Sequence, residues 1–223
     1  MNTRLGIASV AIAFMLILSA SANAALITRL GGQAVYDTDR DITWLADANL
    51  AASQSFGVSG LVAGGLLTWD KSNEWIAAMN ASAYLGYNDW RLPMPLVPDS
   101  SCVSPEAEGL LCNGGEMGHL FYSELFVSPL DSVLLSPVAE ELAKFTNFQS
   151  APYWYGLEYA ANPASAWVFR FDNGNQNGFF KGNLAYALVV RSGDVLAAVP
   201  TPTAAWLMLT GLLSLLGSAR RRH

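Results

Sequence analysis

The chain has 223 residues, of which 52% are hydrophobic and 13% are charged, and its formal net charge at pH 7 is −6. Four of the 12 basic residues are Arg4 and the three arginines of residues 220–222, so the middle carries eight basic against 18 acidic side chains. This acidic middle excludes nucleic acids and anionic lipid surfaces as partners, because both are bound through basic patches. Residues 25–198 have a length that suits one domain.

The N-terminus has the three parts of a secretory signal peptide. Arg4 and the free amine provide positive charge, residues 7–18 form an almost unbroken apolar run, and an Ala-Asn-Ala tripeptide ends at Ala24. The alternative is a membrane anchor, but this run rises only about 18 Å as a helix, short of a hydrocarbon core of about 30 Å. The sequence therefore predicts a signal peptide over residues 1–24, which signal peptidase cuts between Ala24 and Ala25.

The first half of the predicted domain contains a hairpin and a helix. Residues 35–36 and 42–45 are rich in β-branched and aromatic side chains, and the polar residues 37–41 between them suit a turn. Thr68 is a candidate helix N-cap. After it, residues 69–83 place apolar side chains at helical spacing.

The hairpin turn also has a second interpretation, as a calcium site. Asp37, Asp39 and Asp41 place carboxylates at alternate positions, and Ca²⁺ takes about six to eight oxygen ligands. The EF-hand pattern also needs a Glu at its twelfth position, which here is Ala48. Residues 172–178 are rich in oxygen-bearing side chains as well, but they suit a turn equally well. The sequence leaves calcium open at both places.

Cys102 and Cys112 are the two cysteines of the chain, and both lie in the predicted exported portion. An oxidising periplasm favours a disulfide between them. In the chain-entropy model, a loop of this size is stabilised by about 3 kcal/mol. Two cysteines without nearby histidines do not complete a tetrahedral zinc site. The sequence therefore predicts a disulfide that pins the surface loop between the two residues.

The second half of the domain continues with helices and then strands. Residues 116–125 carry apolar side chains on one helical stripe, and residues 138–144 predict a shorter helix. Over residues 167–171 the period changes to two, which is typical of a half-buried strand. The Asn-Gly pair at 173–174 predicts a type I′ turn, and residues 184–191 predict a final strand. This order predicts an α+β fold rather than an alternating parallel sheet.

The sequence contains no evident catalytic set. His119 is the one histidine besides the terminal His223, and a nucleophile needs a base close to it. We expect His119 to be a core or capping residue of the second helix. Arg91, between Trp90 and the helix-breaking Pro93, is expected to hold a loop through paired hydrogen bonds to a carboxylate. The sequence therefore predicts neither enzymatic activity nor a cofactor, calcium excepted.

The C-terminus combines a Pro-rich motif, an apolar segment over residues 203–218 and a cluster of arginines. The apolar segment rises only about 24 Å as a helix, which is short for a permanent span. Because arginines stay on the cytoplasmic side, the domain is expected outside. The motif and the cluster comprise Val199, Pro200, Thr201, Pro202, Arg220, Arg221 and Arg222.

This order of features resembles the PEP-CTERM sorting signal of Gram-negative bacteria, with Thr201 in place of the Glu of the motif. The resemblance implies that residues 199–223 are a sorting segment with a transmembrane helix at about residues 203–219. Such a segment holds the exported protein transiently in the inner membrane, with the domain in the periplasm. An exosortase then cuts it and the product moves to the cell surface or beyond. The alternative is a plain C-terminal anchor.

Four stretches of the middle, residues 36–45, 88–93, 116–122 and 153–193, carry a second likeness. They resemble the DUF1566 or Lcl-like domains, which adopt a C-type lectin-like α+β fold. The resemblance implies a single exported domain over residues 25–198, in which the motif residues are structural. These residues are Trp44, Trp90, Arg91, Leu92, Pro93, Glu116, His119, Trp154, Trp167 and Arg191.

Two classes of function remain open. The first is a non-enzymatic cell-surface or extracellular-matrix protein that binds an exopolysaccharide or another surface protein, and we expect this class because the composition supplies binding surface. The second is a periplasmic or secreted hydrolase or modifying enzyme, which needs a cleft with two carboxyl groups of shifted pKa. Exposed tryptophans favour the first class and buried ones weaken it. The tryptophans in question are Trp69, Trp75, Trp154 and Trp167.

Overall fold

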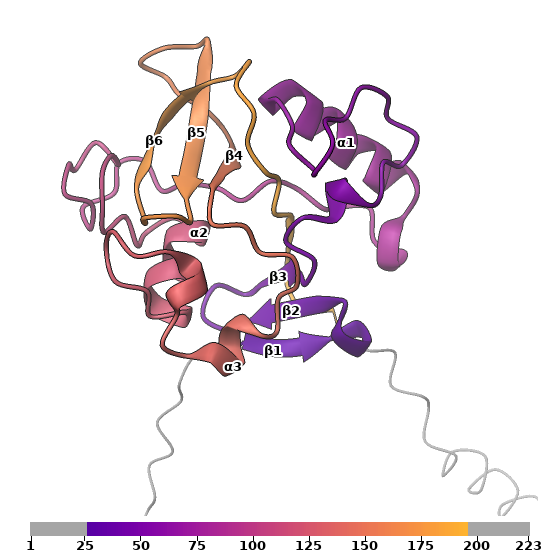
Figure 1. Ribbon diagram of the computed structural model, residues 1–223, viewed down its shortest axis with the longest axis horizontal. Coiled ribbons are helices and arrows are strands. Elements are labelled where there is room, and N and C mark those ends of the chain that lie inside the picture. Colours follow the sequence, from indigo (N-terminus) through magenta and orange to yellow (C-terminus); the bar gives the residue numbers. More distant parts are fainter. Residues whose placement is uncertain (1–25, 196–223) are drawn as a thin grey trace, which may run out of the picture.

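The structure, a computed structural model, describes residues 26–195 (Figure 1). The predicted cleavage site at Ala24 and Ala25 lies outside the described residues, as do the sorting segment 199–223 and its predicted transmembrane helix. Within residues 26–195, no helix is both long and apolar enough to cross a membrane. Helices accompany two antiparallel sheets, so the predicted α+β class is confirmed for this part of the chain.

The first sheet joins the beginning of the described chain to its end. Its strands, in spatial order, are β1 (Leu26–Arg29), β2 (Ala34–Asp37), β3 (Ile42–Leu45) and β7 (Val190–Ser192). The predicted hairpin is confirmed, because β2 pairs with β3 in an antiparallel register that sets Asp37 opposite Ile42. The final strand is shorter than predicted, since Ala185 and Tyr186 form only isolated bridges before β7 begins.

The second sheet consists of β4 (Pro152–Glu158), β5 (Ser165–Arg170) and β6 (Gln176–Phe180) in that order. The strand predicted over residues 167–171 is confirmed, but the prediction that it is half-buried is wrong. Trp167 and Phe169 pack into one hydrophobic core, while Val168 on the opposite face packs into another. Both faces of β5 are covered because Val168 belongs to a second core, together with Trp75 and Met79 of the helix that follows Thr68, a packing that alternation within one strand cannot reveal.

Helix α1 (Trp69–Ala81) confirms the prediction for residues 69–83 to within two residues. Thr68 caps it, since its Oγ1 accepts a hydrogen bond from the Lys71 N–H at 3.3 Å. Trp75 and Met79, one turn apart, are fully buried in the second core. Apolar spacing and a capping residue therefore placed this helix correctly.

The helix predicted over residues 116–125 is present, but it changes form along its length. Helix α2 (Glu116–His119) is followed by a π-helical turn at Leu120–Glu124. In this turn the Leu125 N–H donates to the carbonyl of Leu120, five residues back, at 2.9 Å. Such wide turns place side chains at angles that the ordinary helical period does not predict.

The remaining elements are short. Helix α3 (Ala139–Leu142) occupies the middle of the third predicted helix. The turn at residues 173–174 exists but is not type I′, because that type needs positive φ at both residues and only Gly174, at +78°, has it. Four 3₁₀ turns complete the described elements: Leu30–Gly32, Leu50–Ala52, Tyr84–Gly86 and Val133–Leu135.

Candidate functional site

The disulfide between Cys102 and Cys112 is present, as predicted. The loop that it closes is attached to the second sheet, because the Gly109 N–H and C=O exchange 2.8 Å hydrogen bonds with Gln176 of β6. The Gln176 side chain also donates to the carbonyl of Ala107 at 2.8 Å. We call residues 102–112 the disulfide loop. Its covalent closure and its attachment to β6 fix it in place beside the β4–β5 connection.

The Trp-Arg-Leu-Pro element anchors a loop, as expected for Arg91. The Arg91 guanidinium donates two hydrogen bonds to the Glu116 carboxylate, at 2.8 and 2.7 Å, and this pairing raises the pKa of Arg91. The Met94 N–H donates to the same carboxylate at 2.7 Å. The backbone of Arg91 also pairs with Val190 of β7. The element therefore joins α2 to the first sheet and has a structural role.

The other aromatic and arginine residues of the four sequence stretches quoted above also make packing and pairing contacts. Arg191 donates two hydrogen bonds to Asp89 and lies 4.3 Å from the centre of the Tyr87 ring. Five motif side chains are at most 3% exposed and belong to the two cores. They are Trp44, Trp90, Leu92, Trp154 and Trp167.

The tryptophans expected to favour ligand binding are covered. Trp75 and Trp154 are fully buried, and Trp167 is 3% exposed. Trp69 is half-buried, with its indole N–H donating to the carbonyl of Tyr155 at 2.8 Å and the Lys181 ammonium 4.6 Å from the ring centre. The burial of Trp75, Trp154 and Trp167 weakens one argument for a carbohydrate-binding surface, because stacking on a sugar needs an exposed ring face.

A cavity of about 520 Å³ lies between the disulfide loop and the β4–β5 connection. We call it the groove. The disulfide loop contributes Glu106 and Glu108, and the β4–β5 side contributes Glu158 and Tyr159. The Tyr159 hydroxyl donates to the Glu108 carboxylate, which raises the pKa of this tyrosine. The groove is therefore acidic, with one aromatic wall held across it by a hydrogen bond.

The aromatic wall is positioned by its neighbours. The Tyr159 ring packs edge-on against Trp167, with 4.8 Å between ring centres. It also lies over Gly178 of β6, where an added Cβ would come within 2.8 Å of the ring. Gly178 therefore provides the space that lets Tyr159 lie along the strand. The groove was not foreseen from the sequence, because it combines a loop near residue 106 with another near residue 159.

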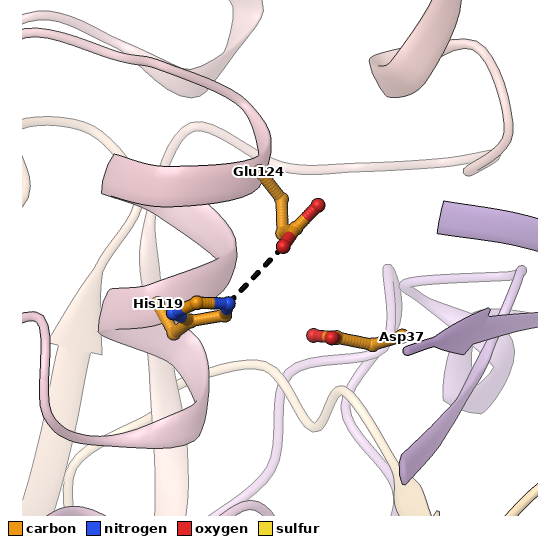
Figure 2. Close-up of side chains that lie close together, drawn as sticks. All are labelled: Asp37, His119 and Glu124. Carbon is orange, nitrogen blue, oxygen red and sulfur yellow. Dashed lines mark hydrogen bonds and ion pairs between the residues drawn. The ribbon is translucent and has the colours of Figure 1, made fainter. Parts of the chain in front are cut away.

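A second group of ionisable side chains lies at the first sheet, where Asp37, His119 and Glu124 point toward one another (Figure 2). The His119 Nε2 is 3.1 Å from Glu124 Oε1 and 3.9 Å from Asp39 Oδ2. Asp37 and Glu124 are 0% and 3% exposed, and His119 is 9% exposed. We call Asp37, His119 and Glu124 the buried cluster. The prediction that His119 is a core residue agrees with this burial, but Glu124 was not foreseen as its partner.

Only one carboxylate oxygen of Asp37 accepts hydrogen bonds within the described residues. Oδ1 accepts hydrogen bonds from the backbone N–H groups of Asp39 and Arg40, both at 3.1 Å. Oδ2 has no partner among residues 26–195, and neither does the indole N–H of the neighbouring Trp44. Burial raises the pKa of Asp37, and the hydrogen bond from the Arg40 N–H, the nearby His119 and the hydrogen bond from the Asp39 N–H oppose that rise.

The three aspartates of the hairpin turn separate in the structure. Asp37 points inward to the buried cluster, while Asp41 accepts a hydrogen bond from the Tyr36 hydroxyl at 2.8 Å. Asp39 is half-exposed near His119. The three therefore do not gather around one point as the ligands of a calcium loop. In the other oxygen-rich stretch, Asp172 accepts two hydrogen bonds from Arg170, as in an ordinary turn.

A scan against models of protein families finds no match to this chain, and a search of curated proteins finds none either.

Proposed function

We propose that this protein is an exported, non-enzymatic surface protein, anchored transiently in the inner membrane, sorted by an exosortase, and able to bind carbohydrate in the groove. The observation that carries the binding proposal is the groove itself, a fixed cavity of about 520 Å³ with carboxylates and a tyrosine on its walls. Small-ligand sites are typically cavities of about 300–1,000 Å³ with a few placed polar groups. The C-type lectin-like fold and the DUF1566 or Lcl-like family belong to this proposal, supported by the motifs quoted above.

The chemistry of the groove favours a neutral or amino sugar. Carboxylates such as Glu106 and Glu108 accept hydrogen bonds from sugar hydroxyl or ammonium groups, and the Tyr159 ring offers an apolar contact. The Ser104 hydroxyl donates to Glu106 and holds the pKa of this carboxyl below its usual range. An acidic uronate polymer would meet repulsion there. We therefore expect polymers of neutral or amino sugars to bind better than uronic acids.

The position of the groove suits a protein that is anchored to the membrane by its C-terminal segment. β1 and β7, where the described chain begins and ends, both belong to the first sheet, whereas the groove lies at the far end of the second sheet by the β4–β5 connection (Figure 1). The groove therefore lies at the opposite end of the domain from the point where the described chain ends. This arrangement supports a binding role while the chain is still anchored.

Binding is tested with the purified full chain on immobilised chitosan oligomers, neutral glucans and alginate. We expect Glu108→Gln to weaken binding of the preferred polymer by about ten-fold, since a hydrogen bond to a charged group contributes about 1.5–3 kcal/mol. The matched control is Glu140→Gln, an exposed carboxylate on α3 that does not line the groove. Equal binding by both variants, or retention of none of the polymers, would refute the proposal.

Export and sorting are tested separately by measuring the mass of the product. In cells with a cognate exosortase, we expect a released form that begins at Ala25 and lacks the arginine cluster. Without the exosortase, the same chain should stay in the membrane fraction with its C-terminus intact. An identical anchored mass in both strains would remove the sorting proposal, and an intact residue 1 in the product would remove the signal peptide.

A further inference from the structure

The buried cluster brings a nitrogen and two carboxylates to one place from three different elements. Asp37 ends β2, while His119 ends α2 and Glu124 ends the following π-helical turn. Each side chain has a potential ligand atom, and these atoms all lie within 4.8 Å of one another. Figure 2 shows the three side chains directed at a common point between the helix and the sheet. The groove does not use any of them.

The π-helical turn is what places His119 and Glu124 together. In an α-helix with about 3.6 residues per turn, side chains five positions apart point about 140° away from each other. The wider turn, with its bond from the Leu125 N–H to the Leu120 carbonyl, brings them to the same side at 3.1 Å. π-turns are frequent at functional sites.

The cluster places two carboxyl groups and one imidazole where little water reaches them. Asp37 and Glu124 provide two buried carboxylates, against which His119 can supply at most one positive charge. Asp37 Oδ2 is buried and, within the described residues, accepts no hydrogen bond. A buried carboxylate oxygen without a partner is costly unless a cation or a donor reaches it. The neighbouring Trp44 N–H is also unmatched, but a neutral donor adds no charge beside two carboxyl groups, so the cluster points to a cation as the missing partner.

We propose that Asp37, His119 and Glu124 bind a divalent transition-metal ion, with Zn²⁺ preferred. A mixed set of one imidazole and two carboxylates suits Zn²⁺ or Mn²⁺, whereas Ca²⁺ takes an all-oxygen shell. One divalent ion would balance the two carboxylates with His119 neutral. This site is distinct from the three-aspartate calcium loop considered from the sequence, and it does not depend on the proposed carbohydrate binding.

The distances are close to those of a bound ion. With bonds of about 2.0–2.1 Å, the ligand atoms of tetrahedral Zn²⁺ lie about 3.3 Å apart. His119 Nε2 and Glu124 Oε1 are already 3.1 Å apart. The Asp37 carboxylate lies within 4.8 Å of both, so it needs to approach by at most about 1.5 Å to complete the set. The backbone N–H groups of Asp39 and Arg40 hold its other oxygen and so act as an outer shell.

The solvent side of the cluster offers both an entry path and a fourth ligand. Asp39 Oδ2 lies 3.9 Å from His119 Nε2, and the Asp39 side chain is 50% exposed. A metal ion can therefore reach His119 past the hairpin turn. Three protein ligands plus either Asp39 or a water would complete a four-coordinate shell.

Metal binding is tested by calorimetry on the full chain after it has been stripped with a chelator. We expect one Zn²⁺ per chain, weaker binding of Mn²⁺, following the general order of metal affinities, and still weaker binding of Ca²⁺. Zn²⁺ should also raise the melting temperature, because an ion that binds the folded state stabilises it. Absence of Zn²⁺ binding up to millimolar concentration, or a preference for Ca²⁺, would overturn the proposal.

Substitutions assign the site. We expect His119→Gln, Glu124→Gln and Asp37→Asn each to weaken Zn²⁺ binding by about 100-fold, since even outer-shell changes cost about 10–100-fold. The matched controls are His223→Gln, which removes the other histidine, and Glu140→Gln, which removes an exposed carboxylate. Loss of binding in His223→Gln with retention in His119→Gln would place the ion elsewhere and refute the proposal.

A measurement on the unaltered chain guards against variants that fail to fold. The chain contains two histidines, so the imidazole region of its NMR spectrum has signals from only His119 and His223. We expect one equivalent of Zn²⁺ to shift the ring signals of His119, and one of Co²⁺ to displace them strongly through its unpaired electrons. Signals of His119 that stay unchanged at full occupancy would refute its role as a ligand.

Discussion

Helix α2 and the turn after it carry acidic side chains with opposite surroundings. At the start of α2, both oxygens of Glu116 accept hydrogen bonds from Arg91, and one also accepts from the Met94 N–H. Past its end, Glu124 faces His119 and the half-matched carboxylate of Asp37. Burial of an acid alone therefore does not indicate a ligand site. The distinction is whether the fold provides enough donors and positive charge for each carboxylate.

Gly118 lies between Glu116 and Glu124, and a substitution there is expected to disturb the surroundings of both side chains more than any other change. A Cβ at this position would lie 1.7 Å from the backbone carbonyl oxygen of Cys112, which has no flexible end to move aside. We expect Gly118→Ala to lower the free energy of unfolding by about 3 kcal/mol or more, because overpacking against backbone forces a shift of the helix. Urea denaturation measures the loss, and Zn²⁺ binding should weaken in the same variant.

The matched control is Gly156→Ala in β4. Its nearest contact would be 3.3 Å from the Leu92 Cβ, a distance that small adjustments relieve. We expect this variant to lose less than about 1 kcal/mol. A Gly118→Ala protein as stable as the control would show that close packing of α2 on Cys112 does not position the two ends.

Arg91→Ala tests the start of α2, where both oxygens of the Glu116 carboxylate accept hydrogen bonds. The change leaves Glu116, whose side chain is 16% exposed, without its guanidinium partner. Because breaking a buried pair costs about 3–5 kcal/mol and this pair is partly exposed, we expect a loss of about 2 kcal/mol in the free energy of unfolding. Arg170→Ala, which breaks a more exposed pair with Asp172, should change it by less than about 0.5 kcal/mol. Similar losses in the two variants would contradict a special role for the Arg91 pair.

Two buried aspartates, Asp99 and Asp37, allow a carboxylate with hydrogen-bond partners on both oxygens to be compared with one that has them on a single oxygen. Asp99 is 2% exposed, and its two oxygens accept hydrogen bonds from Ser101 and Gly114. Asp99→Asn sets an amide N–H against one of these donors, so we expect a loss of about 1–2 kcal/mol. Asp37→Asn replaces the unmatched oxygen with a donor facing Glu124, so the chelator-treated protein should gain about 1 kcal/mol.

Thermal and urea unfolding of the two variants, with and without Zn²⁺, measure this contrast. Added Zn²⁺ should stabilise Asp99→Asn as much as the unaltered chain and leave Asp37→Asn unaffected. A destabilised Asp37→Asn in the chelator-treated state would show that the carboxylate is already well matched without an ion.

A small effect is expected at the partly exposed Arg29–Asp194 pair, where solvent reduces the interaction. Arg29 donates two hydrogen bonds to Asp194 and holds the pKa of this carboxyl below its usual range. Because the folded pKa is lowered, the stabilisation is present above the unfolded value of about 3.9 and is lost as pH falls through the folded pKa. We expect it to be worth about 0.5 kcal/mol.

Comparing melting temperatures at pH 6 and pH 3 measures this contribution. Asp194→Asn should show a smaller drop than the unaltered chain, whereas Asp131→Asn, at an exposed position with no ion pair among the described residues, should show the same drop. An equal drop in all three would show that the Arg29 pair contributes nothing measurable.

Local sequence patterns were enough to predict the elements whose determining residues lie close together in the chain. The hairpin around residues 37–41, helix α1 after Thr68 and the disulfide between Cys102 and Cys112 were all placed correctly. Even the partner type of Arg91 was foreseen as a carboxylate, although the sequence did not identify Glu116. The hairpin and the helix follow from backbone propensity and capping, which act within a few residues. The disulfide follows from two cysteines close together in the chain and from the oxidising compartment.

The candidate sites depended on chain segments that meet only after folding. Glu124 was missed because five-residue spacing does not align side chains in an α-helix, and no pattern announces the π-turn that aligns it with His119. Whether the tryptophans are exposed was left open by the sequence, and the structure buries Trp75 and Trp154 in one core and Trp167 in the other, because both faces of the second sheet are covered.

The sequence by itself determined the α+β class, the hairpin, the capped helix and the covalent loop, since each follows from short-range backbone preferences or from the pairing of two cysteines. The tertiary structure alone decided which acidic side chains have hydrogen-bond or charged partners and which do not. It set Arg91 against Glu116, 25 positions apart, and brought Asp37 to His119 and Glu124 across the gap between a sheet and a helix. The physical reason is that electrostatic satisfaction depends on distance and burial in space, and neither is encoded in the spacing along the chain.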